Sequence, residues 1–61
     1  MLIRRVERFL RRTGMPCTKF GRLAASDPRL VQDMRNGRVP RGPLQDRIEL
    51  FIAHYQDGAH A

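Results

Sequence analysis

The chain has 61 residues, which is enough for one small domain and too few for a two-lobed enzyme with a buried cleft. Apolar residues make up 41% and charged residues 30% of the sequence, a balance typical of a folded domain rather than a disordered one. Twelve Lys and Arg residues against six Asp and Glu residues give a net charge of +6, which indicates a polyanionic partner.

The positive charge is concentrated in the first two thirds of the chain. Residues 1–40 carry ten basic and three acidic side chains, whereas residues 41–61 carry two and three. All but one of the basic residues are arginines, whose planar guanidinium groups bind phosphates and guanine edges in a bidentate manner. Arginine-biased codons of a GC-rich genome would also enrich arginine, but they explain the uneven distribution less well.

The first predicted helix spans residues 2–13. Gly14 ends it, and Pro16 prevents it from resuming. Its two faces differ, with Leu2, Ile3, Val6, Phe9 and Leu10 on one and Arg4, Arg5, Arg8, Arg11 and Arg12 on the other. A basic amphipathic helix can also lie on a membrane surface, but the apolar faces of the later segments favour burial within a bundle.

Two short helices are predicted next, over residues 19–25 and 28–36. Thr18 is the expected N-cap of the earlier helix, and Asp27 that of the later one, with Pro28 in its first position. In the earlier helix, Phe20, Leu23 and Ala24 are expected to point inward, and Gly21 to let another helix approach closely.

The last predicted helix spans residues 43–55, after a loop over 38–42 that contains Pro40 and Gly42. Its apolar face comprises Leu44, Ile48, Phe51, Ile52 and Tyr55. Residues 57–61 are expected to form a frayed tail. The sequence therefore predicts an all-α fold, a small bundle of four to five short helices in one domain over residues 1–56.

Two short helices joined by a tight turn form a helix-turn-helix, whose second helix must bury one side and offer the other to the DNA major groove. In the helix over 28–36, helical spacing places Leu30, Val31 and Met34 on one side and Arg29, Gln32 and Asn36 on the opposite side. Arg and Gln are suited to bidentate recognition of bases. A solvent-exposed face with an Arg29–Asp33 ion pair would show the same pattern.

Residues 18–37, followed by Pro40, resemble the core of lambda-repressor-like (Cro/repressor, XRE-type) DNA-binding domains. The resemblance rests on the Phe20-Gly21 pair, the tight turn, Val31 and Met34 inside the second helix, and Asn36-Gly37 at its end. It implies a helix-turn-helix fold in which the base-contacting positions are Pro28, Arg29, Gln32 and Asp33. The positions that it implies for the DNA backbone are Cys17, Thr18, Lys19, Asn36, Arg38 and Arg41, and the neighbouring charges of Arg22 and Arg35 extend this set.

Other reactive residues do not predict a catalytic or metal site. Cys17 is the only cysteine, and His54 and His60 lie far from it in sequence, so no metal-ligand spacing is present. The carboxylates are scattered and no glycine-rich phosphate loop occurs, so neither enzymatic activity nor a cofactor is expected. No apolar run is long enough for a signal peptide or a membrane span, and a cytoplasmic, nucleoid-associated location is expected.

The function predicted from these features is sequence-specific binding of double-stranded DNA by a small bacterial or phage transcriptional regulator. It would act by occluding a promoter or by touching RNA polymerase. No small-molecule effector is expected, because the chain has no room for an effector domain. The alternatives are a nonspecific nucleic-acid-binding basic protein and a helical adaptor or antitoxin-like module with an acidic protein partner.

A homodimer through the last helix is a further prediction. Leu50 lies on the side of that helix opposite the apolar face, beside Arg47 and His54. Two recognition helices in a symmetric dimer would address half-sites roughly 34 Å apart, so the target would be an inverted repeat.

Overall fold

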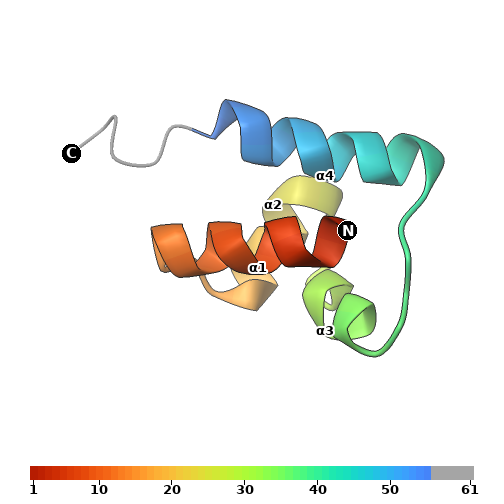
Figure 1. Ribbon diagram of the computed structural model, residues 1–61, viewed down its shortest axis with the longest axis horizontal. Helices are drawn as coiled ribbons and strands as arrows, with labels where there is room; N and C mark the ends of the chain where they lie inside the picture. The colour runs from red at the N-terminus through yellow and green to blue at the C-terminus, as the bar shows by residue number, and fades with distance from the viewer. Residues whose placement is uncertain (56–61) are drawn as a thin grey trace.

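Four helices, each bounded by glycine, proline or a tight turn, make up the described part of the chain. The computed structural model describes residues 1–55, which form α1 (Leu2–Thr13), α2 (Cys17–Ala25), α3 (Leu30–Arg35) and α4 (Gly42–His54) (Figure 1). No strand occurs within residues 1–55, so the predicted all-α bundle is confirmed. The tail predicted over residues 57–61 lies outside the described residues.

The first helix has the bounds that its periodicity predicts. Val6, Phe9 and Leu10 are its buried residues, and its arginines are exposed. Gly14 ends the helix in the left-handed conformation, at φ 73°, where its N–H donates to the Leu10 carbonyl over 2.8 Å. Glycine suits this position because it has no Cβ to oppose a positive φ.

The second helix differs from its prediction in two respects. It begins at Cys17 rather than at residue 19, because the extended residue before it, Pro16, accepts the Phe20 N–H at 3.0 Å. The prediction of Thr18 as N-cap is therefore wrong, since Thr18 lies inside the helix. The inward orientation predicted for Leu23 is also wrong: it is 53% exposed, because burial on α2 is centred on Phe20, Gly21 and Ala24.

A close approach at Gly21 determines how α2 meets α3. The Asp27 N–H donates to the Gly21 carbonyl over 3.0 Å, and the Asp27 carbonyl oxygen occupies the space that a Cβ on Gly21 would need. The Leu30 Cβ lies 3.3 Å from the same point. The expected close approach is confirmed, and its nearest partner is the backbone of the turn. Ser26, with φ 55°, reverses the chain at this turn.

The third helix is shorter than predicted, spanning Leu30–Arg35 rather than residues 28–36. Pro28 and Arg29 form a turn instead, in which the Asp27 Oδ1 accepts the Arg29 N–H at 3.0 Å and the Asp27 carbonyl accepts the Leu30 N–H at 3.1 Å. The predictions of Asp27 as the N-cap and of Pro28 as the first helical residue are therefore wrong, since the N-cap is Arg29 and Pro28 lies in the turn. Asp27 instead holds the turn that leads into α3.

The last helix covers the aromatic part of the core. It begins and ends one residue before the prediction; Ile48 is fully buried, and the other members of its predicted apolar face pack against the core. Phe9 of α1 lies at the centre, with ring centroids 5.5 Å from Phe20, 5.9 Å from Phe51 and 5.2 Å from Tyr55. One aromatic cluster thus joins α1, α2 and the C-terminal end of α4 with the residue that follows it.

Candidate nucleic-acid interface

The two sides of α3 have opposite character. Leu30 and Val31 are fully buried and Met34 is 4% exposed, so the apolar side is sealed against α1 and α2. Arg29 and Gln32 are exposed, as helical spacing predicts. A helix of six residues does not hold its shape alone in water, so this packing is what presents the outer side in a fixed conformation.

Arg29 forms no ion pair within residues 1–55. The i,i+4 pair with Asp33 that the sequence allows is not formed, because Asp33 instead accepts a hydrogen bond from Arg38 Nη1 at 3.3 Å. Asp33 is half-buried, whereas Gln32 is exposed and its side chain forms no hydrogen bond to the described residues. The turn before α3 and the outer side of α3 therefore present a guanidinium and an amide whose donors and acceptors are available to a ligand.

Arg38 links the loop after α3 to the turn before it. Its Nη1 donates to Asp27 Oδ2 over 3.0 Å as well as to Asp33. The hydrogen bond from Arg38, aided by the Arg29 backbone N–H, holds the pKa of Asp27 below its usual value, and the same bond raises the pKa of Arg38. Arg38 was predicted as a phosphate contact; the structure gives it this internal role while leaving the residue exposed.

Arg35 joins α3 to α1. Its Nε and Nη2 donate to the two carboxylate oxygens of Glu7 over 2.7 and 2.8 Å, a bidentate arrangement. This bond lowers the pKa of Glu7, and the hydrogen bond to the Glu7 carboxylate raises the pKa of Arg35. The pair joins residues 28 positions apart in sequence, so the residue pattern held no local signal for it.

The other residues predicted to contact the DNA backbone lie on two segments that flank α3. Thr18, Lys19 and Arg22 are exposed on α2, whereas Cys17 at its start is half-buried. Asn36 is exposed at the end of α3, and Arg41 is exposed at the end of the loop that runs to α4. None of Lys19, Arg22 and Arg41 forms an ion pair with the described residues. Pro28, predicted as base-contacting, is exposed in the turn before α3.

A second group of arginines lies on α1. Arg4, Arg8 and Arg11 are exposed opposite the buried side of the helix, and we call these three the arginine ridge. Arg5 and Arg12 flank the ridge on the side that faces α4: Arg5 lies 3.6 Å from the Glu49 carboxylate, and the Arg12 guanidinium lies 5.4 Å from the centre of the Phe9 ring. The ridge is thus a cationic surface on α1, next to the Glu7 carboxylate that binds Arg35 of α3.

The residues predicted for a dimer lie together on the outer side of α4. Leu50 is 56% exposed, and Arg47 and His54 are exposed next to it. Leu50 also lines a shallow depression between α4 and α1, together with Ala53 of α4 and Arg5 of α1. This side of α4 is therefore open to another molecule.

Searches for other kinds of site and for related proteins gave no positive result. Residues 1–55 contain no group of three or more His, Cys, Asp or Glu residues placed to hold a metal ion. No helix in the same part of the chain has the length and apolar character needed to cross a membrane. No protein-family model, curated protein or solved structure matches the chain.

Proposed function

We propose that the protein is a sequence-specific double-stranded DNA-binding protein that regulates transcription. In this proposal α2 and α3 act as a helix-turn-helix, and the segment 28–36 enters the major groove. Binding represses transcription by occupying the promoter, or activates it by direct contact with RNA polymerase. The lambda-repressor-like resemblance of residues 18–37 points to the same activity.

The observation that carries the proposal is that Arg29, in the turn that leads into α3, and Gln32, on α3 itself, are exposed and form no side-chain hydrogen bond or ion pair with residues 1–55, while the apolar side of α3 is buried. Arg forms bidentate hydrogen bonds to guanine O6 and N7, and Gln forms them to adenine N6 and N7. Two other arginines of this region stabilise the fold, and their guanidinium groups are bound to carboxylates: Arg35 to Glu7 and Arg38 to Asp27. Arg29 has no such partner within residues 1–55. The half-buried Asp33 is the candidate for accepting a hydrogen bond from a cytosine amino group.

The flanking cations support the same proposal. Lys19 and Arg22 precede the turn and Arg41 follows α3, so positive charge lies on both sides of the proposed reading residues. Contacts to phosphates fix the register of a recognition helix without reading sequence. The exposed Thr18 and Asn36 provide neutral polar groups at the same two places, where they would bind phosphate oxygens.

The test compares Arg29→Ala with Arg41→Ala, a matched substitution of an exposed arginine outside the reading residues. A preferred duplex is first obtained by selection from random sequences, and affinities are then measured by fluorescence anisotropy. Arg29→Ala should lose about 1–3 kcal/mol on the preferred duplex and relax its preference at one base pair. Arg41→Ala should weaken all duplexes alike and reduce the slope of log K against log salt by about one.

Equal effects of the two substitutions on preferred and random duplexes would show that Arg29 does not read bases. They would favour the second candidate function, nonspecific binding of nucleic acid by charge. The arginine ridge supports that candidate, because three exposed arginines at helical spacing offer a phosphate surface with no reading residues. Nonspecific binding predicts a steep salt dependence and no enrichment of any sequence during selection.

We also propose that two copies of the chain pair through α4. An antiparallel pairing centred on Leu50 brings the two Leu50 side chains together and places Asp46 of each copy opposite His54 of the other, where the imidazole N–H can donate to the carboxylate. Leu50→Arg is expected to abolish the dimer, as measured by sedimentation equilibrium, because it places two like charges at the centre of the pairing. Leu23→Arg, a control at a similarly exposed leucine on α2, should leave the dimer intact. A wild-type chain that is monomeric up to about 1 mM would contradict the pairing.

A further inference from the structure

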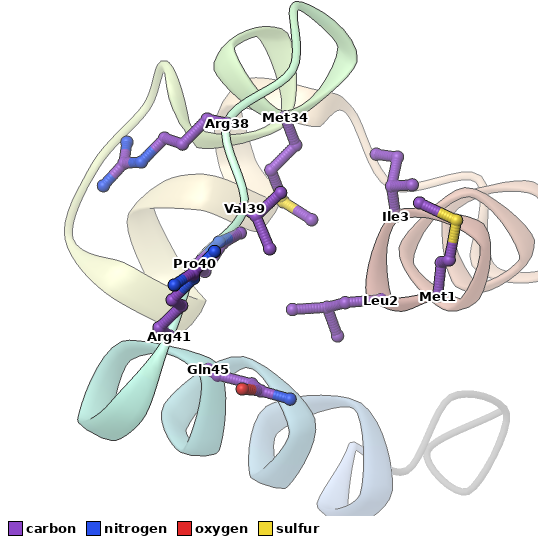
Figure 2. Close-up of a pocket in the computed structure, with 9 residues that line it drawn as sticks. All are labelled: Met1, Leu2, Ile3, Met34, Arg38, Val39, Pro40, Arg41 and Gln45. Atoms are coloured by element: carbon purple, nitrogen blue, oxygen red, sulfur yellow. The ribbon is translucent and has the colours of Figure 1, made fainter.

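A cavity of about 470 Å³ lies where four segments meet: the start of α1, the end of α3, the loop that follows it and the start of α4. Figure 2 shows Leu2, Met34 and Val39 pointing toward one another across this space. Ile3 and Pro40 add to its apolar lining. The volume falls within the range of small-molecule sites, about 300–1,000 Å³.

The position of Val39 shows that the lining is not simply part of the core. Val39 is 62% exposed and lies in the loop between Arg38 and Pro40, whereas Met34 and Pro40 are buried. An isolated exposed valine is ordinary, but this one faces a hollow whose other walls are also apolar. Filling the hollow with an apolar group would remove the surfaces of Leu2, Val39 and the group itself from water, which is favourable by about 25 cal/mol per Å².

The polar groups at the edge of the cavity favour a negative charge. Arg41 is exposed and forms no ion pair with residues 1–55. It directly precedes α4, a helix of 13 residues whose start has no side-chain cap and no acidic residue in its first turn. The uncapped backbone N–H groups carry partial positive charge, which adds to that of Arg41. Arg38 contributes only its aliphatic part, because its guanidinium points away from the cavity toward Asp27 and Asp33 (Figure 2).

We propose that this cavity binds a small anionic amphiphile, a soluble molecule with an apolar chain or ring and one carboxylate or phosphate group. The apolar part lies against Leu2, Met34 and Val39, and the anionic group lies at Arg41 and the start of α4. The sequence alone predicts no small-molecule effector because it leaves no room for a separate effector domain. The cavity needs none, since it lies inside the four-helix unit.

Occupation of the cavity would act on the proposed DNA-binding surface, and this part of the inference rests on the proposed function. Met34 belongs to the buried side of α3, and the segment 38–41 carries Arg41, one of the proposed phosphate contacts. An anion at Arg41 would compete with a DNA phosphate for the same guanidinium. We therefore expect the ligand to weaken DNA binding.

The experiment titrates the 61-residue chain with decanoate below its micelle concentration, without DNA, and follows backbone amide shifts by NMR. We expect saturable binding, with the largest shifts at residues 38–45 and at Leu2 and Ile3. Decanol, which has the same chain without the charge, should bind at least about threefold more weakly. Arg41→Gln should reduce this difference between the two probes by removing the cation at the rim.

Val39→Asp is the decisive variant, and Leu23→Asp is its matched control. Both replace an exposed apolar side chain, so both variants should fold, which circular dichroism checks. Val39→Asp places a carboxylate in the cavity and should weaken decanoate binding by about tenfold or more, whereas Leu23→Asp should change it by less than about twofold. No saturable binding, equal effects of the two variants, or shifts centred on the arginine ridge would each overturn the site. Since this titration contains no DNA and the duplex selection contains no decanoate, either proposal can fail independently.

Discussion

Gly21→Ala is expected to destabilise the protein by about 3 kcal/mol, although alanine is the better helix former by about 1 kcal/mol. Gly21 lies inside α2, where propensity alone predicts a gain. A Cβ at this position would overlap the Asp27 carbonyl oxygen, which is backbone and cannot rotate away. The turn would have to move, and the hydrogen bond from the Asp27 N–H to the Gly21 carbonyl would be distorted. The sign of the effect therefore distinguishes the close approach from simple helix propensity.

The measurement is urea denaturation followed by circular dichroism. Arg22→Ala, at the next and exposed position of the same helix, is the control and should change the unfolding free energy by less than about 0.5 kcal/mol. Because the turn also orients α3, Gly21→Ala at a temperature where it remains folded should lose DNA affinity as well. A Gly21→Ala variant as stable as the wild type would show that α2 and the turn are not in contact.

Phe9→Ala is expected to cost about 3–5 kcal/mol, enough to leave much of so small a protein unfolded at room temperature. The Phe9 ring is 1% exposed and contacts the rings of Phe20, Phe51 and Tyr55. Its removal would leave a cavity at the point where α1, α2 and α4 meet. A 61-residue domain has few other buried side chains with which to compensate.

Thermal unfolding followed by circular dichroism tests this expectation. Phe9→Leu is the matched control: it keeps most of the apolar volume but not the ring contacts, and it should cost about 1–1.5 kcal/mol. A Phe9→Ala variant that loses less than Phe9→Leu would contradict the central place of this ring in the core.

The helices could be predicted from sequence because their signals are local. The bounds of α1 follow from its amphipathic spacing and from Gly14, and those of α4 agree with the prediction to within one residue. The errors lie where two local signals compete. Thr18 is a good capping residue by type, but the carbonyl of Pro16 already accepts the first helical N–H. Leu23 is apolar, but it lies at the margin of the buried side of α2, and no other helix covers it.

The candidate site was predictable only in part. Helical spacing is enough to place Arg29 and Gln32 opposite Leu30 and Val31. It does not reveal which charged groups pair, since partner choice depends on the tertiary fold. The Arg35–Glu7 pair spans 28 positions, and Asp33 pairs with Arg38 rather than with Arg29. The cavity beside Val39 was missed for the same reason, because its walls come from four separate segments.

The separation of the two sides of α3 bears on how such a protein could diversify. The groups that hold this short helix in place are Leu30, Val31 and Met34, together with the Arg35–Glu7 pair, and neither Arg29 nor Gln32 is among them. Substitutions at exposed positions without such partners usually change stability little. Descendants of this chain could therefore acquire new targets through a few exchanges on the outer side, while the scaffold beneath is inherited unaltered.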